Sequence, residues 1–478
     1  MRHVSCFRSR CVALTRPRAA RALADEAGPV IAPLRAVSGA DEVLASRGDP
    51  FVAFLSAKDA PSLLLRCADD AALASRLAGA VVLDAADASE RPPGESPAVR
   101  TPQPEWAESS AAAAHAWNPA GSGLAAKRLP FPVLLAAPGD GAAALRAAAA
   151  HNERRAYDAP PLYHARLDHG MIATGNAAAC LEASTCLPLG GYSAFAAAPL
   201  PAPPPGAAPP RLLLVTAALD SAALFHERAV GADASLSGLV VMLAAADAMN
   251  RLPPLPAAPA RRVAFAALAG EPWGHIGTRM LLAQLAGGAR PAGVGAAEAG
   301  VDLLELSSLG CDVASGAPVQ LYAHAAGDAG APMAAALVAA AGTSGGAVRV
   351  AMAWAQAPGL PPSGLRAARR RDAAIGGVVL SDYDASYGSA FFGSRYDDGP
   401  PAAASLAAAA DVIAAALHAL AAGAARPPQP PAGGRAATLR RVEALMVRSG
   451  LQKPHSFGVS RVADASHCAG VLDAGAAQ

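Results

Sequence analysis

The stretch that most constrains the fold is residues 262–278, with the sequence RVAFAALAGEPWGHIGT. Residues 262–269 are predicted as a strand, because an apolar run bounded by glycine and proline is typical of a buried strand in a parallel sheet. A glycine-punctuated turn follows, and residues 279–285 are predicted as a helix. Ligands of such sheets bind at the carboxyl ends of the strands. Glu271 therefore lies where a functional carboxylate is expected.

Strand-like and helical segments alternate in both halves of the chain. In the first half the predicted strands are residues 51–55, 79–83 and 131–135, with helical spacing over 60–77. In the second half the predicted strands are residues 211–216, 262–269, 303–306, 347–353 and 377–380, and the predicted helices include 237–249 and 403–422. This alternation predicts an α/β protein of two lobes, the larger with a mostly parallel sheet flanked by helices.

Composition divides the chain into segments. Residues 29–198 are expected to form the small lobe, a proline-rich run at 199–210 a connector, and residues 209–424 the large lobe. The tail 425–478 is rich in proline and glycine and then weakly helical, and it has no core pattern of its own. Residues 1–28 carry arginines and no acid before Asp25, which fits either a transit-peptide-like leader or a misassigned gene start.

Charge and apolar patterning exclude several classes. With a net charge of +1 and 16% charged residues, nothing points to nucleic acid as a partner. No apolar run reaches the roughly 20 residues of a membrane helix. The nearest, residues 404–425, is interrupted by Asp411 and His418 and predicts a soluble alanine-rich helix. Cys180 and Cys186 are the only close cysteine pair beyond the first few residues, and they can form a disulfide or remain two thiols.

Three stretches, in this order and spacing, resemble the co-catalytic zinc aminopeptidases: ALDS at 218–221, GADASLSG at 231–238 and GEPWGHIGT at 270–278. Those enzymes hold two metal ions with five ligands and use a glutamate to move the proton. The resemblance retains Asp220 and the glutamate, Glu271. The five ligand positions fall on residues that cannot replace the ligands, namely Ala218, Ala234, Pro272, Ser307 and Tyr383. The resemblance therefore implies an aminopeptidase-like fold with no zinc site, no cofactor and no catalysis.

Further segments resemble the nicastrin family, the large subunits of γ-secretase complexes, which have this peptidase fold without its metal site. They are residues 117–124 followed by 131–132, and 243–248, 359–365, 376–382 and 407–423. The resemblance implies a non-catalytic scaffold that gates substrate ectodomains, with presenilin and the other γ-secretase subunits as partners and membrane-protein stubs as substrates. It also implies a lumenal or extracellular ectodomain in the secretory pathway.

The chain departs from that family in identifiable places. The family signature Asp-Tyr-Ile-Gly-Ser is Gly-His-Ile-Gly-Thr here, at residues 274–278. The family's membrane helix, its glycosylation sites and most of its disulfides have no counterpart in the sequence, so a truncated gene model and a divergent copy are both open. An active zinc aminopeptidase-type hydrolase with other ligands is the alternative function.

Several residues have two possible roles. Glu271 either caps a helix or contacts the amino terminus of a substrate, with Asp220 and His275 beside it; His275 is otherwise a packed residue at the start of the helix. Trp117, in a loop at 113–124, is either a lid over the large-lobe pocket, as the resemblance implies, or a local plug. Phe225, which the resemblance places beneath that lid, is otherwise a core aromatic.

Overall fold

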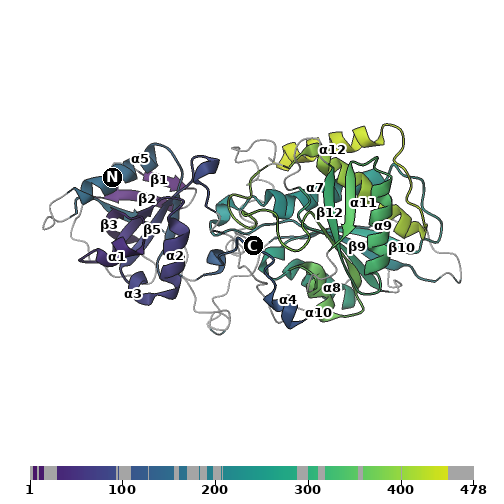
Figure 1. The fold of residues 1–478 in the computed structure, drawn as a ribbon, viewed down its shortest axis with the longest axis horizontal. Coiled ribbons are helices and arrows are strands. Elements are labelled where there is room, and N and C mark those ends of the chain that lie inside the picture. Colours follow the sequence, from purple (N-terminus) through teal and green to yellow (C-terminus); the bar gives the residue numbers. More distant parts are fainter. Residues whose placement is uncertain are drawn as a thin grey trace. The chain divides into compact units, whose positions relative to one another are not determined.

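The computed structural model describes residues 4–7, 10–15, 29–92, 95, 109–127, 129–154, 161–168, 182, 191–197, 206, 208–287, 300–310, 318–353, 359–399 and 401–449 (Figure 1). The chain divides into two compact units, residues 1–96 with 122–186 and residues 97–121 with 187–478. The segment that includes Trp117 thus belongs to the second unit. The pair Cys180 and Cys186 lies outside the described residues.

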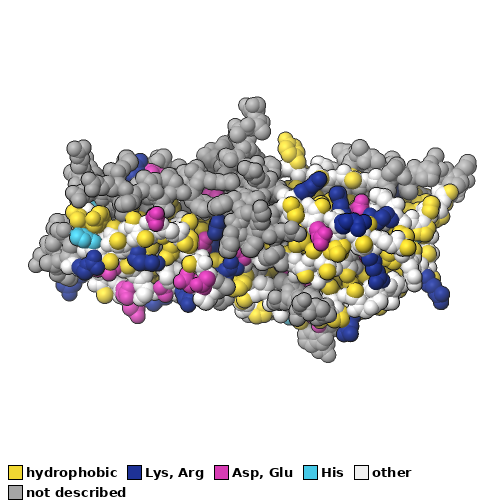
Figure 2. Space-filling view, turned by 90° about the horizontal axis from the view of Figure 1, so that it is seen from above, with side chains coloured by type: hydrophobic (Ala, Val, Ile, Leu, Met, Phe, Trp, Pro, Cys, Tyr) yellow, Lys and Arg dark blue, Asp and Glu magenta, His cyan; other side chains and the backbone are white. Residues whose placement is uncertain are grey.

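The first unit is built on a seven-stranded sheet of order β1-β2-β7-β3-β4-β5-β6. Its strands are β1 (Val4–Phe7), β2 (Arg10–Thr15), β3 (Val30–Ala36), β4 (Phe51–Leu55), β5 (Leu77–Leu83), β6 (Val133–Ala136) and β7 (His164–Leu167). Strands β3 to β6 are parallel, whereas β7 is antiparallel to β2 and β3. The helices are α1 (Ala40–Ala45), α2 (Ala60–Asp69), α3 (Ala71–Ala74) and α5 (Asp140–Glu153). On the part of this unit seen in Figure 2, basic and acidic side chains are interspersed.

The helix predicted over residues 60–77 is divided in the structure. Asp70 adopts an extended conformation, and its carboxylate accepts the backbone N–H groups of Ala72 and Leu73. A side chain that caps a new helix in this way competes with continuation of the old one. The break therefore separates α2 from α3, and β5 begins at Leu77.

The second unit is built on a seven-stranded sheet of order β13-β12-β14-β11-β9-β10-β8. Its strands are β8 (Ala194–Ala197), β9 (Arg211–Ala218), β10 (Arg261–Leu268), β11 (Val301–Leu306), β12 (Val319–Ala326), β13 (Val348–Met352) and β14 (Gly376–Ser381). Neighbours β10, β9, β11 and β14 are parallel, so their carboxyl ends share one edge. The prediction of an α/β protein with a mostly parallel sheet is confirmed. The antiparallel pairings of β8 and β12 were not predicted from the sequence.

Helices cover both faces of this sheet. One face packs against α7 (Gly238–Met249), α9 (Gly330–Gly342) and α11 (Ala403–Ala422), and the other against α8 (Ile276–Ala286) and α10 (Gly364–Arg371). Alternate residues of β9 point to opposite faces of the sheet. Leu213 and Val215 belong to the hydrophobic core on the α7, α9 and α11 side, and Leu212 and Leu214 belong to the core on the α8 and α10 side. Two described helical segments are long and apolar enough to cross a membrane, Ala232–Met249 and Ala403–Ala422, but they are 72% and 78% buried inside the protein. Their hydrophobicity is therefore that of core helices.

The C-terminal region differs from the sequence expectation. Helix α12 (Gly434–Ser449) packs on α7 and α11, and its Val442 and Met446 are buried in the same core. The sequence predicted no core contribution from this region. The alanine-rich surface of α11 explains the packing, because small side chains let a further helix approach closely.

A buried ion cluster joins three strands of the large sheet. Asp302 of β11 is 0% exposed. Its carboxylate accepts hydrogen bonds from Nη2 of Arg211 at 2.6 Å and from Nε of Arg261 at 3.3 Å. The hydrogen bond to Asp302 raises the pKa of Arg211. Because the two arginines belong to β9 and β10, one carboxylate ties together the beginnings of three adjacent strands, at the edge opposite the carboxyl ends.

We expect Asp302→Asn to lower the free energy of unfolding by about 3 kcal/mol, because losing one partner of a buried ion cluster leaves charge uncompensated. Denaturant titration of the full chain measures the loss. The control is Asp247→Asn, which breaks a more exposed i,i+4 pair with Arg251 and should cost under about 1 kcal/mol. Equal losses in the two variants would contradict a special role for the Asp302 cluster.

Candidate functional site

The turn after β10 carries the first site residue. Gly270 and Gly274 have φ of 89° and 75°, and His275 has φ of 52°, the one positive φ of a non-glycine among the described residues. This succession folds the chain back at once into α8. The carboxylate of Glu271, 9% exposed, then accepts the N–H of Thr278 at 2.7 Å and its hydroxyl at 3.1 Å. Glu271 is therefore fixed at the N-terminus of α8, where the helix dipole favours a negative charge.

Two glycines permit the close packing around this carboxylate. A Cβ at Gly277 would lie 2.5 Å from the carbonyl oxygen of Ala269 and 2.9 Å from Oε1 of Glu271. A Cβ at Gly364, the first residue of α10, would lie 2.5 Å from the hydroxyl of Thr278. Both helices consequently begin against Glu271, and neither glycine can gain a side chain without displacing the site.

A second carboxylate, Glu305 of β11, faces the first. Its two oxygens accept the N–H groups of Gly364 at 3.0 Å and Leu365 at 2.8 Å, in the first turn of α10. Burial raises the pKa of Glu305; the nearby His275 opposes this shift and the charge of Glu271 adds to it. The sequence analysis missed Glu305, although a glutamate within the apolar run 301–306 was the available signal.

His275 lies between the two carboxylates. Its Nδ1 is 3.3 Å from Oε2 of Glu271. One ligand atom each of Glu271, His275 and Glu305 can be chosen so that all three lie within 4.8 Å of one another. The structure thus brings His275 to Glu271, and it places the carboxylate of Glu305 beside both.

Asp220 joins the same region from the end of β9. Its Oδ2 accepts the N–H of Gly270 at 2.7 Å, which ties β9 to the turn that carries Glu271. Its Oδ1 is buried without a hydrogen-bond partner among the described residues. Burial raises the pKa of Asp220 to about 6, with a further contribution from the charge of Glu271. Three carboxyl groups therefore gather near the carboxyl ends of β9, β10 and β11.

Trp117 packs into an aromatic cluster of the second unit. It follows α4 (Ser110–Ala114), is 1% exposed, and contacts the rings of His115, His324 and Tyr383 at centroid distances of 4.6, 5.9 and 6.5 Å. Its carbonyl oxygen accepts the N–H of Tyr387 at 2.8 Å. The charge of Glu305 acts on both Tyr383 and Tyr387, so the cluster borders the acidic region. Phe225 packs under the guanidinium of Arg395, whose carbon lies 4.8 Å from the centre of its ring.

The five positions at which the peptidase resemblance expects metal ligands lie around the same sheet edge. Ala218 ends β9, Ala234 lies in a π-helical turn (Ala232–Ser237), Pro272 lies in the turn after β10, and Ser307 and Tyr383 follow β11 and β14. Alanine and proline offer no side-chain donor atom, and the other two offer only hydroxyls.

The π-helical turn is held by a buried pair of aspartates. Asp397 accepts the N–H groups of Asp233 and Ala234 at 2.9 and 3.1 Å, and Asp233 accepts the N–H of Gly310 at 3.0 Å. Burial raises the pKa of Asp397 to about 7, and the charge of Asp233 adds to the shift. Asp397 therefore fastens the loop after β14 to the beginning of α7.

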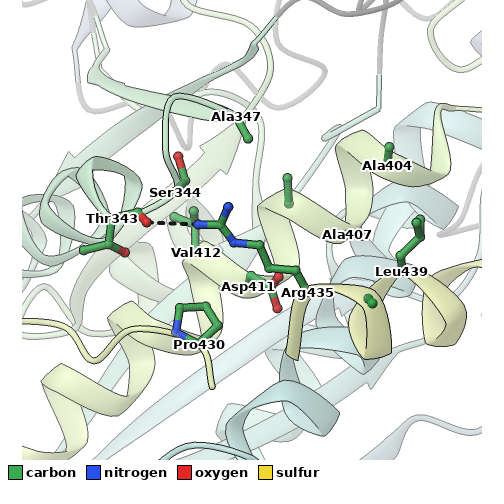
Figure 3. A pocket seen from close by; sticks show the side chains of 12 residues that line it. Thr343, Ser344, Ala347, Ala404, Ala407, Asp411, Val412, Pro430, Arg435 and Leu439 are labelled. Carbon is green, nitrogen blue, oxygen red and sulfur yellow. Dashed lines mark hydrogen bonds between the residues drawn. The ribbon is translucent and has the colours of Figure 1, made fainter. Parts of the chain in front are cut away.

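A separate hollow of about 250 Å³ lies between the end of α9, α11 and α12, and five of its twelve lining residues are alanines (Figure 3). Arg435 at its rim donates to the carbonyl oxygen of Thr343, and Asp411 accepts the hydroxyl of Thr438. None of the site residues lines it. Small side chains leave this space unfilled where α12 crosses its neighbours, and we assign it no ligand.

Comparison with known proteins gives concordant matches. The model of the nicastrin large lobe matches residues 211–422, and that of the nicastrin small lobe matches residues 24–173. Nicastrin of Arabidopsis thaliana is 27% identical over 356 residues, which are 73% of this chain and 52% of that protein. Human nicastrin is 27% identical over 306 residues, 59% of this chain and 42% of that protein. The chain thus spans about half the length of the relatives it matches.

One solved structure supports the fold. The crystal structure of the γ-secretase component nicastrin superposes with a TM-score of 0.64 at 18% identity, covering 87% of this chain and 74% of that one. A zinc aminopeptidase of Bacillus subtilis aligns with a TM-score of 0.42 at 15% identity, covering 82% and 74%.

We expect Trp117→Ala to speed hydrogen exchange both in residues 109–121 and in the loop 382–399, because a buried indole contributes about 3–5 kcal/mol to packing. Mass-spectrometric exchange on the full chain measures this. The control is Tyr192→Ala, since Tyr192 is 85% exposed and should leave both segments unchanged. Faster exchange confined to the immediate neighbours of residue 117 would mean that the indole is only a local plug.

The free energy of unfolding should also fall as pH rises from about 4 to about 7, because burial raises the pKa of Asp397. Between about pH 4, where the unfolded carboxyl titrates, and about pH 7, the folded chain keeps a proton that the unfolded chain has released. Asp397→Asn should flatten this slope, at some cost in stability because an amide replaces one acceptor oxygen. Urea titrations at several pH values test it, with the exposed Asp328→Asn as control. An unchanged slope in the Asp397 variant would refute the assignment.

Proposed function

Because the chain belongs to the nicastrin family, we propose that it is a non-catalytic subunit of an intramembrane-cleaving protease complex of the γ-secretase type. In this complex it works with presenilin and the other γ-secretase subunits, scaffolds the assembly and recognises membrane-protein stubs. Its lobes then lie on the lumenal or extracellular side of a membrane in the secretory pathway. The nicastrin whose fold this chain shares is itself a γ-secretase component.

The residue types at the peptidase ligand positions support the non-catalytic assignment. Co-catalytic hydrolysis requires two metal ions to bind and activate water. Ala218, Ala234 and Pro272 have no donor atom for a metal. Glu271 remains where the proton-transferring glutamate is expected, and its carboxylate is oriented by Thr278 at the start of α8.

The observation that carries the recognition role is the acidic cluster beyond the strand ends. Glu271 and Glu305 present carboxyl groups within 4.8 Å of each other, Asp220 binds the N–H of the neighbouring Gly270, and Tyr383 and Tyr387 lie near enough to feel the charge of Glu305. A substrate ammonium group is attracted both to carboxylates and to aromatic faces. We propose that Glu271 binds the free amino terminus of a stub, with Asp220 and His275 shaping the site. The Trp117 segment then acts as a lid, so that long ectodomains are excluded by their size.

We expect Glu271→Gln to weaken the binding of a stub with a free amino terminus by about 10-fold or more, because a hydrogen bond to a charged group is lost. Gln retains an acceptor for the Thr278 N–H, so the helix cap should lose at most about 1 kcal/mol. Fluorescence anisotropy with the assembled complex, in the presence of a chelator, measures the affinity. Thermal unfolding of the same variant checks the cap.

The matched control is the same stub with an acetylated amino terminus. The native complex should prefer the free amine, and the Gln variant should bind both stubs equally. No preference in the native complex would refute the amine site. Failure of the chain to co-purify with presenilin would refute the subunit assignment, and turnover of aminoacyl substrates by the purified chain would favour the hydrolase alternative.

A further inference from the structure

We propose that Glu271, His275 and Glu305 form a binding site for one divalent transition-metal ion, with Zn²⁺ as the probe. The three residues come from the turn after β10 and from β11, and a ligand atom of each lies within 4.8 Å of the others. One imidazole nitrogen and two carboxylate oxygens are a donor set that zinc accepts in proteins, with a fourth position left for water. This inference goes beyond the proposed function and does not rest on it.

The separation of the donors fits a shared ion. Zinc bonds of 2.0–2.1 Å in a tetrahedron place neighbouring ligand atoms about 3.4 Å apart. Nδ1 of His275 and Oε2 of Glu271 are 3.3 Å apart, so these two donors already have the spacing of a tetrahedral edge. Glu305 completes the triad, because one ligand atom of each of the three residues lies within 4.8 Å of the others.

Hydrogen bonds from neighbouring residues orient both carboxylates. Glu271 is oriented by Thr278, and Glu305 by the N–H groups of Gly364 and Leu365. Metal-ligating carboxylates are usually supported in this way. Each carboxylate oxygen has two lone pairs, so a hydrogen bond leaves one for a metal. The triad is thus positioned by the fold before any ion arrives.

The charge of the region also calls for a cation. When ionised, Asp220, Glu271 and Glu305 carry three negative charges. Asp220 is only 5% exposed, and its Oδ1 has no hydrogen-bond partner among the described residues. The N-termini of α8 and α10 supply about half a positive charge each. Roughly two negative charges remain, which a divalent ion matches.

The proposed ion differs from the peptidase metals in its ligands. It would use Glu271 as a ligand, so the same carboxylate could not act as a general base. The ion also occupies the position proposed for the substrate ammonium group, and the two should therefore compete.

The test is isothermal titration of Zn²⁺ into the full chain after chelator treatment, followed by Co²⁺ absorption spectroscopy. We expect one ion per chain at this site, and at least a 10-fold loss of affinity in Glu305→Gln and in His275→Gly. His275→Gly is the matched variant, because glycine adopts φ near 52° without strain and should keep or raise the melting temperature. His151→Gln, which alters a histidine of α5, should leave the affinity unchanged.

Equal zinc affinity in the native chain, Glu305→Gln and His275→Gly would mean that the ion binds elsewhere and would overturn the proposal. So would a sulfur-to-cobalt charge-transfer band, which indicates cysteine ligation, or no zinc binding by the native chain. The preference of the complex for a stub with a free amino terminus is measured in the presence of a chelator. A failure of the metal proposal therefore does not affect that measurement. Conversely, zinc binding that depends on the triad stands even if the complex shows no amine preference.

Discussion

The hydrogen bonds from Thr278 to the carboxylate of Glu271 are the interaction on which the site depends. They fix one carboxylate at the start of α8, and they require the left-handed turn before it. The close approach of Gly277 and Gly364 follows, since any Cβ there would meet the same group of atoms. Once α10 begins beside Glu271, its first N–H groups bind Glu305, and two negative charges come to lie together. One capped helix thus organises both carboxylates and the histidine between them.

This arrangement keeps the glutamate of the peptidase resemblance, while the positions where that resemblance expects metal ligands carry other residue types. A parallel sheet gathers its strand ends at one edge whether or not the residues there are ligands. In this chain that edge keeps Asp220 and Glu271 but has alanine or proline at three of the positions where the peptidase resemblance expects metal ligands. The remaining carboxylates supply the negative charge on which the proposed ammonium site and the proposed single-ion site both rest, whereas co-catalytic hydrolysis needs two metal ions.

The second unit also obtains part of its aromatic core from a segment that interrupts the first unit in sequence. Trp117 inserts among His324 and Tyr383, and its backbone bonds Tyr387. The loop after β14 is fastened a second time by Asp397 at the beginning of α7. The region beside the acidic cluster is therefore held by one indole and one carboxylate, and both act on the same loop.

The sequence by itself determined the class of fold and the place of Glu271. The local apolar pattern predicted the strand at 51–55, residues 211–216 of β9 and the whole of α11, because a buried strand or helix must repeat its apolar residues at its own period. It did not reveal β8 or β12, since strands that contain several alanines carry little β signal. Tertiary structure alone decided that Glu305 meets residues 364 and 365, that Trp117 meets residue 387, and that Asp302 pairs with arginines of two other strands. Those partners are far apart in the chain, and strand order, which no local pattern encodes, is what brings them together.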